Sequence, residues 1–249
     1  MRETWVVMRR ELGSYFHTPI AYVFGALFLL VACGLGSLFG ALQHGAQASL
    51  GGFFSTLPWL FLFFLPALTM RLWAEERKAG TLELLLTFPV TIRQLIAGKF
   101  LASMAFLGLL MALTLGLPIS MSAFGDLDWY QVLVTYCASM LMAAAYVSVG
   151  MFWSSMTRDQ IIAFLLSVTT LAGLFWIVPW IGSRLIGVLP GWLGGDWVVL
   201  VLASVSPKHY FDSVSYGVAD TGDLVYYICF CTFFLYANAL VLYGKRVKG

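Results

Sequence analysis

The chain has 249 residues, of which 61% are hydrophobic and only 10% are charged, and its formal net charge is +2. Soluble domains carry about 25% charged residues, so this composition excludes an ordinary soluble protein and indicates an integral membrane protein. A helix needs about 20 apolar residues to cross the bilayer core. We therefore expect one all-α transmembrane domain, residues 1–249, with six membrane-spanning helices.

Residues 2–16 are predicted to form an amphipathic helix that lies in the headgroup plane. One face of this helix is apolar and carries Trp5, Met8, Leu12, Tyr15 and Phe16. The opposite face carries Arg2, Glu3, Arg9, Arg10, Gly13 and Ser14. We expect Trp5, Met8 and Leu12 to anchor the helix in the interface, with the basic residues toward anionic lipid. A cleavable signal peptide is the competing interpretation, and the acidic residues Glu3 and Glu11 count against it.

Six apolar stretches follow, and each is long enough to cross the bilayer. Their expected bounds are 19–42, 53–72, 95–121, 131–153, 161–181 and 224–244. Residues 182–223 differ, because Gly, Pro and Trp interrupt them and their apolar run is too short to cross. We expect an external loop there, with short re-entrant helices that protein or water must cover.

Charge is dense in one long stretch between the second and third expected spans, and we call residues 73–90 the charged segment. Mixed charges flank a Gly80–Thr81 break, and a leucine-rich run follows. We expect a short helix, capped by Thr81, that lies across the membrane surface and faces a partner. The residues expected at that contact are Glu75, Glu76, Arg77, Lys78, Gly80, Thr81, Leu82, Glu83, Leu84 and Leu85. A plain solvated loop is the alternative, but topology alone requires neither the acidic pair nor the leucines.

The distribution of Lys and Arg predicts the orientation of the chain. All 14 basic residues except Arg184 and Lys208 fall in the N-terminal helix, in residues 71–99, near residue 158 or in the C-terminal tail. The positive-inside rule therefore places both termini and the charged segment in the cytoplasm.

Several kinds of chemistry find no support in the sequence. A Gly-x-x-x-x-Gly-Lys-Ser/Thr loop is missing, so any ATP hydrolysis is expected on a separate chain. The three histidines share no metal-ligand spacing, and the four cysteines sit in apolar runs as small hydrophobes. An ionisable residue in the middle of an expected span is also missing, which counts against a proton-coupled carrier. We expect this chain to have no catalytic residue, bound metal, cofactor or nucleic-acid partner.

The run from Arg71 to Glu76, with the break and leucine run after it, resembles the coupling segment of type-2 ABC exporter permeases. Within these proteins it is most similar to the gliding-motility-associated group. Residues 11–20 and 206–212 are similar to the same group at lower specificity. Tyr216 departs from the pattern, because that group often has a basic residue at this position.

The resemblance implies the permease subunit of an ATP-driven export complex in a bacterial inner membrane. Two ATPase subunits, which carry ATP and Mg, would dock on the coupling segment, where charged side chains and leucines would make the contacts. Gly80 would permit the break that sets the helix angle. A second copy or a related permease, an accessory subunit with a large external domain, and membrane lipid are the other implied partners. Two alternatives remain open: a mechanotransmitter that passes ATP-driven motion to an external partner without moving a substrate, and a non-catalytic membrane scaffold.

Overall fold

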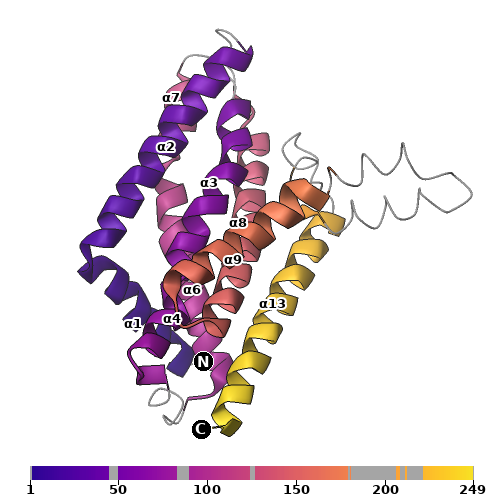
Figure 1. Ribbon diagram of the computed structural model, residues 1–249. Coiled ribbons are helices and arrows are strands. Elements are labelled where there is room, and N and C mark those ends of the chain that lie inside the picture. Colours follow the sequence, from indigo (N-terminus) through magenta and orange to yellow (C-terminus); the bar gives the residue numbers. More distant parts are fainter. Residues whose placement is uncertain are drawn as a thin grey trace, which may run out of the picture.

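The computed structural model describes residues 2–44, 50–82, 90–123, 127–178, 180, 206–207, 211 and 221–248. Within these residues, all regular secondary structure is helical (Figure 1). The helices are α1 (Arg2–His17), α2 (Pro19–His44), α3 (Gly51–Thr69), α4 (Arg71–Lys78), α6 (Ile92–Leu113), α7 (Gly116–Ser122), α8 (Trp129–Met156), α9 (Gln160–Ala172), the π-helix η1 (Gly173–Ile177) and α13 (Thr221–Lys248).

The described helices are consistent with the expected membrane architecture. Five segments are long and apolar enough to cross a membrane: Gly51–Lys78, Ile92–Ser122, Trp129–Met156, Gln160–Ile177 and Thr221–Gly244. A sixth span results if Glu3–His17 and Ala21–Gly34 are taken as one pair, although these two helices meet at an angle of 80°. The described residues therefore confirm a helical fold with five to six candidate membrane spans. The expected re-entrant loop at 182–223 falls mostly outside the described residues.

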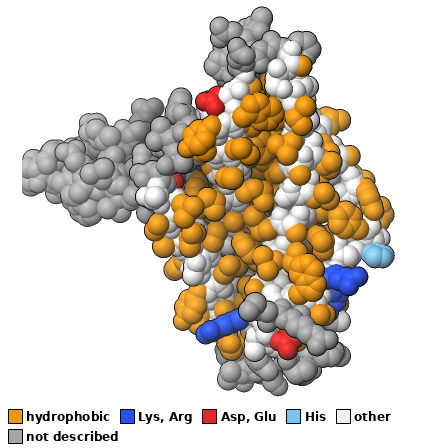
Figure 2. Space-filling model, turned by 180° about the vertical axis from the view of Figure 1, so that it is seen from behind, with side chains coloured by type: hydrophobic (Ala, Val, Ile, Leu, Met, Phe, Trp, Pro, Cys, Tyr) orange, Lys and Arg blue, Asp and Glu red, His pale blue; other side chains and the backbone are white. Residues whose placement is uncertain are grey.

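The helices bring distant parts of the chain to one end of the bundle. Figure 1 shows α1, α4 and both termini at its lower end. Figure 2, seen from behind, shows hydrophobic side chains over the middle of the molecule and Lys or Arg side chains near the lower end. We call this lower end, formed by α1, α4, the start of α6 and the end of α8, the charged end.

Two glycines allow helices to approach closely near the charged end. A Cβ atom on Gly98 of α6 would lie 2.6 Å from Val7 Cγ1 and 3.2 Å from the Thr4 carbonyl oxygen of α1. A Cβ atom on Gly150 of α8 would collide with the side chain of Thr69, the last residue of α3. Small residues at such crossings are typical of membrane helix packing, and here they fix α1 against α6 and α8 against α3.

The third expected span, 95–121, is broken into α6 and α7. Pro118 lies in the first turn of α7, and its ring would clash with the carbonyl of residue 114 in a continuous α-helix. The α6 helix accordingly ends at Leu113, and Thr114 and Leu115 form a turn before α7 begins. The expected span 161–181 is also not a uniform α-helix, because α9 continues into the π-helical turn η1. In this turn, the Trp176 ring stacks on Trp59 with 4.0 Å between the ring centroids.

Candidate functional site: a buried charge network at the charged end

The first part of the charged segment forms α4, which follows α3 after the turn residue Met70. The backbone amides of Trp73 and Ala74, in its first turn, donate hydrogen bonds to Ser154 Oγ of α8 at 3.1 and 3.2 Å. The Ser154 hydroxyl donates in turn to the Met70 carbonyl at 2.9 Å. First-turn amides lack partners within their own helix turn, so a fully buried serine from another helix caps α4.

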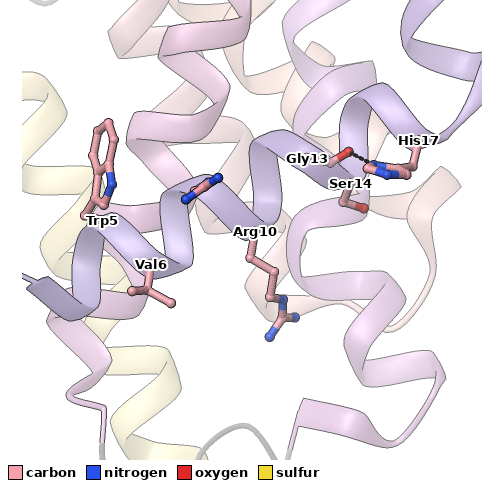
Figure 3. Close-up of a pocket in the computed structure, with 7 residues that line it drawn as sticks. Trp5, Val6, Arg10, Gly13, Ser14 and His17 are labelled. Atoms are coloured by element: carbon pink, nitrogen blue, oxygen red, sulfur yellow. Dashed lines mark hydrogen bonds between the residues drawn. The ribbon is translucent and has the colours of Figure 1, made fainter.

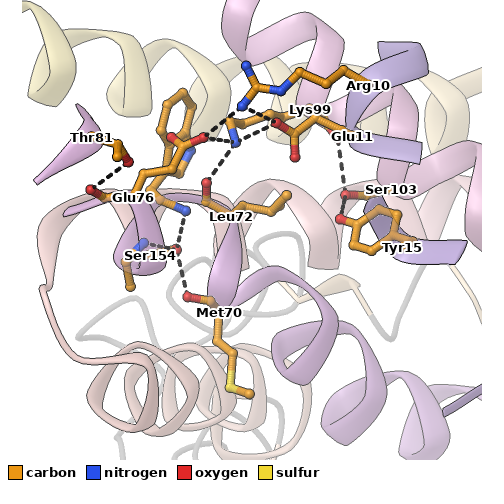
Figure 4. A network of polar contacts seen from close by, with 12 residues as sticks. Arg10, Glu11, Tyr15, Met70, Leu72, Glu76, Thr81, Lys99, Ser103 and Ser154 are labelled. Carbon is orange, nitrogen blue, oxygen red and sulfur yellow. Dashed lines mark hydrogen bonds and ion pairs between the residues drawn. The ribbon is translucent and has the colours of Figure 1, made fainter. Parts of the chain in front are cut away.

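The ammonium group of Lys99 lies at the centre of this end of the molecule. Its side chain is only 2% exposed, and Nζ donates to Glu76 Oε1 at 2.8 Å and Glu11 Oε1 at 3.1 Å. The third donor reaches the Leu72 carbonyl at 2.9 Å, and Nζ lies 5.0 Å from the centre of the Trp73 ring. A lysine ammonium has three donors, and all three are used here. Figure 4 shows how the side chains converge.

The charges of this network come from three helices. Glu11 belongs to α1, Glu76 to α4 and Lys99 to α6, and both carboxylate side chains are about 15% exposed. Arg10 adds a second positive charge from the outside, with Nη2 at 3.7 Å from Glu11 and 3.9 Å from Glu76. Two cations therefore balance two anions, which is how buried charges become tolerable in a low-dielectric interior.

Further polar contacts fasten the same helices together. Tyr15 of α1 and Ser103 of α6 share a hydrogen bond of 3.2 Å, one turn beyond the Lys99 network. Arg77 of α4 donates from Nη1 to the carbonyls of Ser155 and Met156 at 3.2 and 2.7 Å. These carbonyls belong to the last turn of α8, where a cation is favourable because the helix dipole is negative. The α4 helix is thus held by α1, α6 and α8 together.

The structure separates the residues that were predicted to form one partner contact. Glu75 is 60% exposed, and Lys78, Gly80 and Thr81 are also exposed. Glu76 and Arg77 instead bond within the chain, and Leu82, with 6% exposure, lies in the hydrophobic core. Glu83, Leu84 and Leu85 fall outside the described residues.

The local shape of the charged segment also differs from the expectation. The charged residues form α4 before the break at Gly80, and the Thr81 hydroxyl donates back to the Glu76 carbonyl at 3.3 Å rather than capping a new helix. Thr81 and Leu82 are helical again, and the rest of the helix expected after the break falls outside the described residues. Gly80 has φ of +70°, the sole positive φ among the described residues. Since an L side chain is strained in that conformation, glycine is required where the chain turns away from α4.

The predicted anchors on α1 are also divided. Met8 and Leu12 are partly buried, and Leu12 packs against the core, so this face of α1 contacts the protein itself. Trp5 is 62% exposed and lies on the outer side, together with the exposed residues Arg9 and Arg10. The predicted opposition of Trp5 to the arginines is therefore wrong, because Trp5 and Arg9 are four residues apart and share one side of the helix. The Leu12 face instead packs against the protein.

Sequence analysis missed the centre of the network. The positive-inside rule predicts only a cytoplasmic location for Lys99, whereas the structure places it two turns inside α6, directly after Gly98. The sequence assigns Glu11 no buried partner. A charged residue within an otherwise apolar run indicates a buried partner of opposite charge. The sequence does not show which of several carboxylates is that partner.

The arrangement pairs buried charges and caps α4. The described residues contain no group of three His, Cys, Asp or Glu side chains placed to hold a metal ion. The network joins a short charged helix to three others by short, directional contacts.

Comparison with known proteins assigns the fold to a family. The model of the ABC-2 family of transporter proteins matches residues 60–192, more than half of the chain. The chain belongs to the ABC-2 transporter family. The matched region includes α4, α6 and α8, and therefore Glu76, Lys99 and Ser154 of the network.

A curated relative of this ABC-2 protein is described as "Probable ABC transporter permease protein NosY" of Stutzerimonas stutzeri. The two sequences are 28% identical over 167 residues, and the match spans 60% of each chain. Family and fold together establish a multi-pass membrane protein of the ABC-2 family. The narrower resemblance to the gliding-motility-associated group is not distinguished by these matches.

Proposed function

We propose that this ABC-2 protein is the permease subunit of an ATP-driven export complex, and that α4 is the helix through which a separate ATPase acts on it. The observation that carries this proposal is that one side of α4 is exposed while the other is bonded to three helices. Its exposed side bears Glu75 and Lys78, while its other side is bonded to α1, α6 and α8. A helix mounted in this way can receive a push from outside and pass it to three other helices.

Each contact of α4 has a distinct place in this transfer. The ion pair between Glu76 and Lys99 would pull α6, and the same ammonium carries the motion to α1 through Glu11. The Ser154 cap and the Arg77 contacts would move the end of α8. The Lys99 and Ser154 contacts are short and largely shielded from water, so they resist displacement better than exposed ion pairs do. The Arg77 contact with Met156 is exposed.

The surroundings of the subunit follow from the family resemblance. We infer an inner-membrane location with both termini and α4 in the cytoplasm, because basic residues concentrate at the charged end. Two ATPase subunits, with their ATP and Mg, and a second permease copy or a related permease complete the proposed complex. The gliding-associated resemblance adds an accessory subunit with an external domain to the proposal.

The test is to co-express the chain with an ABC-type ATPase and purify the complex in detergent. Glu75→Lys/Glu83→Lys should weaken recovery of the ATPase, because each reversal repels a basic partner surface. Asp159→Lys is the matched control, since Asp159 is exposed near the same end and makes no capping hydrogen bond. We expect Glu83, beside the leucine run, to contribute more than Glu75, and Glu83 lies outside the described residues.

Loss of the ATPase with a monodisperse permease would support docking on α4. Exposed charges act mainly on the association rate and are screened by salt, so the difference between the double variant and the original chain should shrink as the salt concentration rises. Full recovery of the ATPase and unchanged ATP turnover in the double variant would refute the docking role. Equal losses in the Asp159 control would show that the effect is not specific to the charged segment.

A further inference from the structure

A shallow hollow of about 580 Å³ runs along the outer side of α1. Its lining residues are Trp5, Val6, Arg9, Arg10, Gly13, Ser14 and His17. They recur at intervals of three or four residues, so they form one stripe along the helix. Figure 3 shows Trp5 and Val6 at one end of the hollow and Ser14 and His17 at the other.

Two guanidinium groups give this hollow a positive charge. Arg9 is exposed and takes part in none of the ion pairs among the described residues. The side chain of Arg10 is 64% exposed, and its acidic neighbours lie at 3.7 and 3.9 Å, which leaves donors free on its outer side. Guanidinium groups suit phosphate, because their planar donors match two of its oxygens at once.

Apolar surface adjoins the positive charge at both ends of the hollow. Trp5 and Val6 are about 60% exposed at one end. Beyond His17, the ring of Phe16 lies 6.4 Å from that of Tyr22 in α2. Tyr22 and Val23 are 63% and 66% exposed, so the apolar surface continues from the hollow onto a membrane-spanning helix.

We propose that the outer side of α1 binds an anionic phospholipid, with its phosphate on Arg9 and Arg10 and an acyl chain along the start of α2. The occupant has to be anionic at one end and apolar at the other, and it has to reach a surface that borders the membrane. A phospholipid meets all three conditions, and an exposed tryptophan is typical of the headgroup level. The site does not depend on an ATPase and would be present in the isolated chain.

The test is a titration of the detergent-purified full chain with dioleoyl phosphatidylglycerol or dioleoyl phosphatidylcholine, followed by native mass spectrometry. We expect tighter binding of the anionic lipid, and Arg9→Gln should weaken it about fivefold, which corresponds to one basic residue at an anionic surface. Arg9→Lys should retain most of the binding. Arg93→Gln is the matched control, because Arg93 is exposed at the charged end but does not line the hollow.

The alternatives give different results in the same experiment. Equal affinity for the two lipids, or equal losses in Arg9→Gln and Arg93→Gln, would overturn the proposal. Displacement of the lipid by an equal concentration of inorganic phosphate would show a phosphate site without an acyl-chain subsite, and would overturn it as well. A weaker but still selective response in Tyr22→Ser would support the acyl-chain path.

Discussion

Replacing Lys99 by methionine tests whether the buried network holds the charged end together. The substitution keeps the length of the side chain but removes the cation from between Glu11 and Glu76, which lie at 3.1 and 2.8 Å from Nζ. Removing one partner of a buried ion pair costs about 3–5 kcal/mol, because the other charge stays buried without compensation. Arg10 lies close enough to offset part of this loss, so we expect about 3 kcal/mol.

Combining Lys99→Met with Glu76→Leu tests the network more sharply. The double variant no longer buries the Glu76 charge, and Glu11 keeps Arg10 as a neighbour. The remaining loss is the hydrogen bond to the Leu72 carbonyl, worth about 1 kcal/mol. We therefore expect the double variant to be more stable than Lys99→Met alone.

The assay is SDS-induced unfolding of the detergent-purified protein, followed by tryptophan fluorescence. Arg10→Gln serves as the control and should cost less than about 1 kcal/mol, because an exposed pair contributes little. Strictly additive losses for Lys99→Met and Glu76→Leu would refute the network, since residues in one network show coupling energies of about 0.5–3 kcal/mol.

Two further predictions concern packing and topology. Gly98→Ala should lower the free energy of unfolding by about 1–3 kcal/mol, because the new methyl group would overpack against Val7. Adding Val7→Ala should restore only part of this loss, because the Cβ of residue 7 would still lie 2.8 Å from the new Cβ. A stabilised Gly98→Ala protein in the same SDS titration would contradict the α1–α6 contact. An impermeant thiol reagent applied outside the cell should label Asp220→Cys but not Lys78→Cys, and external labelling of Lys78→Cys would reverse the proposed orientation.

Hydropathy along the chain was enough to predict the spans, because crossing a bilayer depends on the summed apolarity of about 20 consecutive residues. The faces of the helices could not be predicted in the same way. Leu12 and Trp5 both looked suited to lipid, yet Leu12 packs against the protein and Trp5 does not. Lipid tails are as apolar as leucine, so periodicity shows an apolar face without showing what covers it.

The charged segment shows the same limit for polar residues. Its position and mixed charge could be identified, and Gly80 was correctly placed at the break. Glu75 is exposed whereas its neighbour Glu76 is largely buried, and this difference depends on Lys99. Lys99 lies 23 positions beyond Glu76 and approaches it only through tertiary packing. A one-dimensional pattern contains no information on that approach.

The way α8 is held has a consequence for the distance over which motion can travel. Gly150 and Ser154 lie one turn apart and face the α3–α4 junction, and the carbonyls that Arg77 binds follow within the next two residues. All three contacts are therefore confined to the last two turns of a helix of 28 residues, about 42 Å long. The rest of α8 is held as well, because it packs against α3, α6, α9 and α13, and its buried residues extend from Val132 to Ser155. Motion received at the α4 end would therefore reach the start of α8 only together with the helices around it, so the bundle would move as one body.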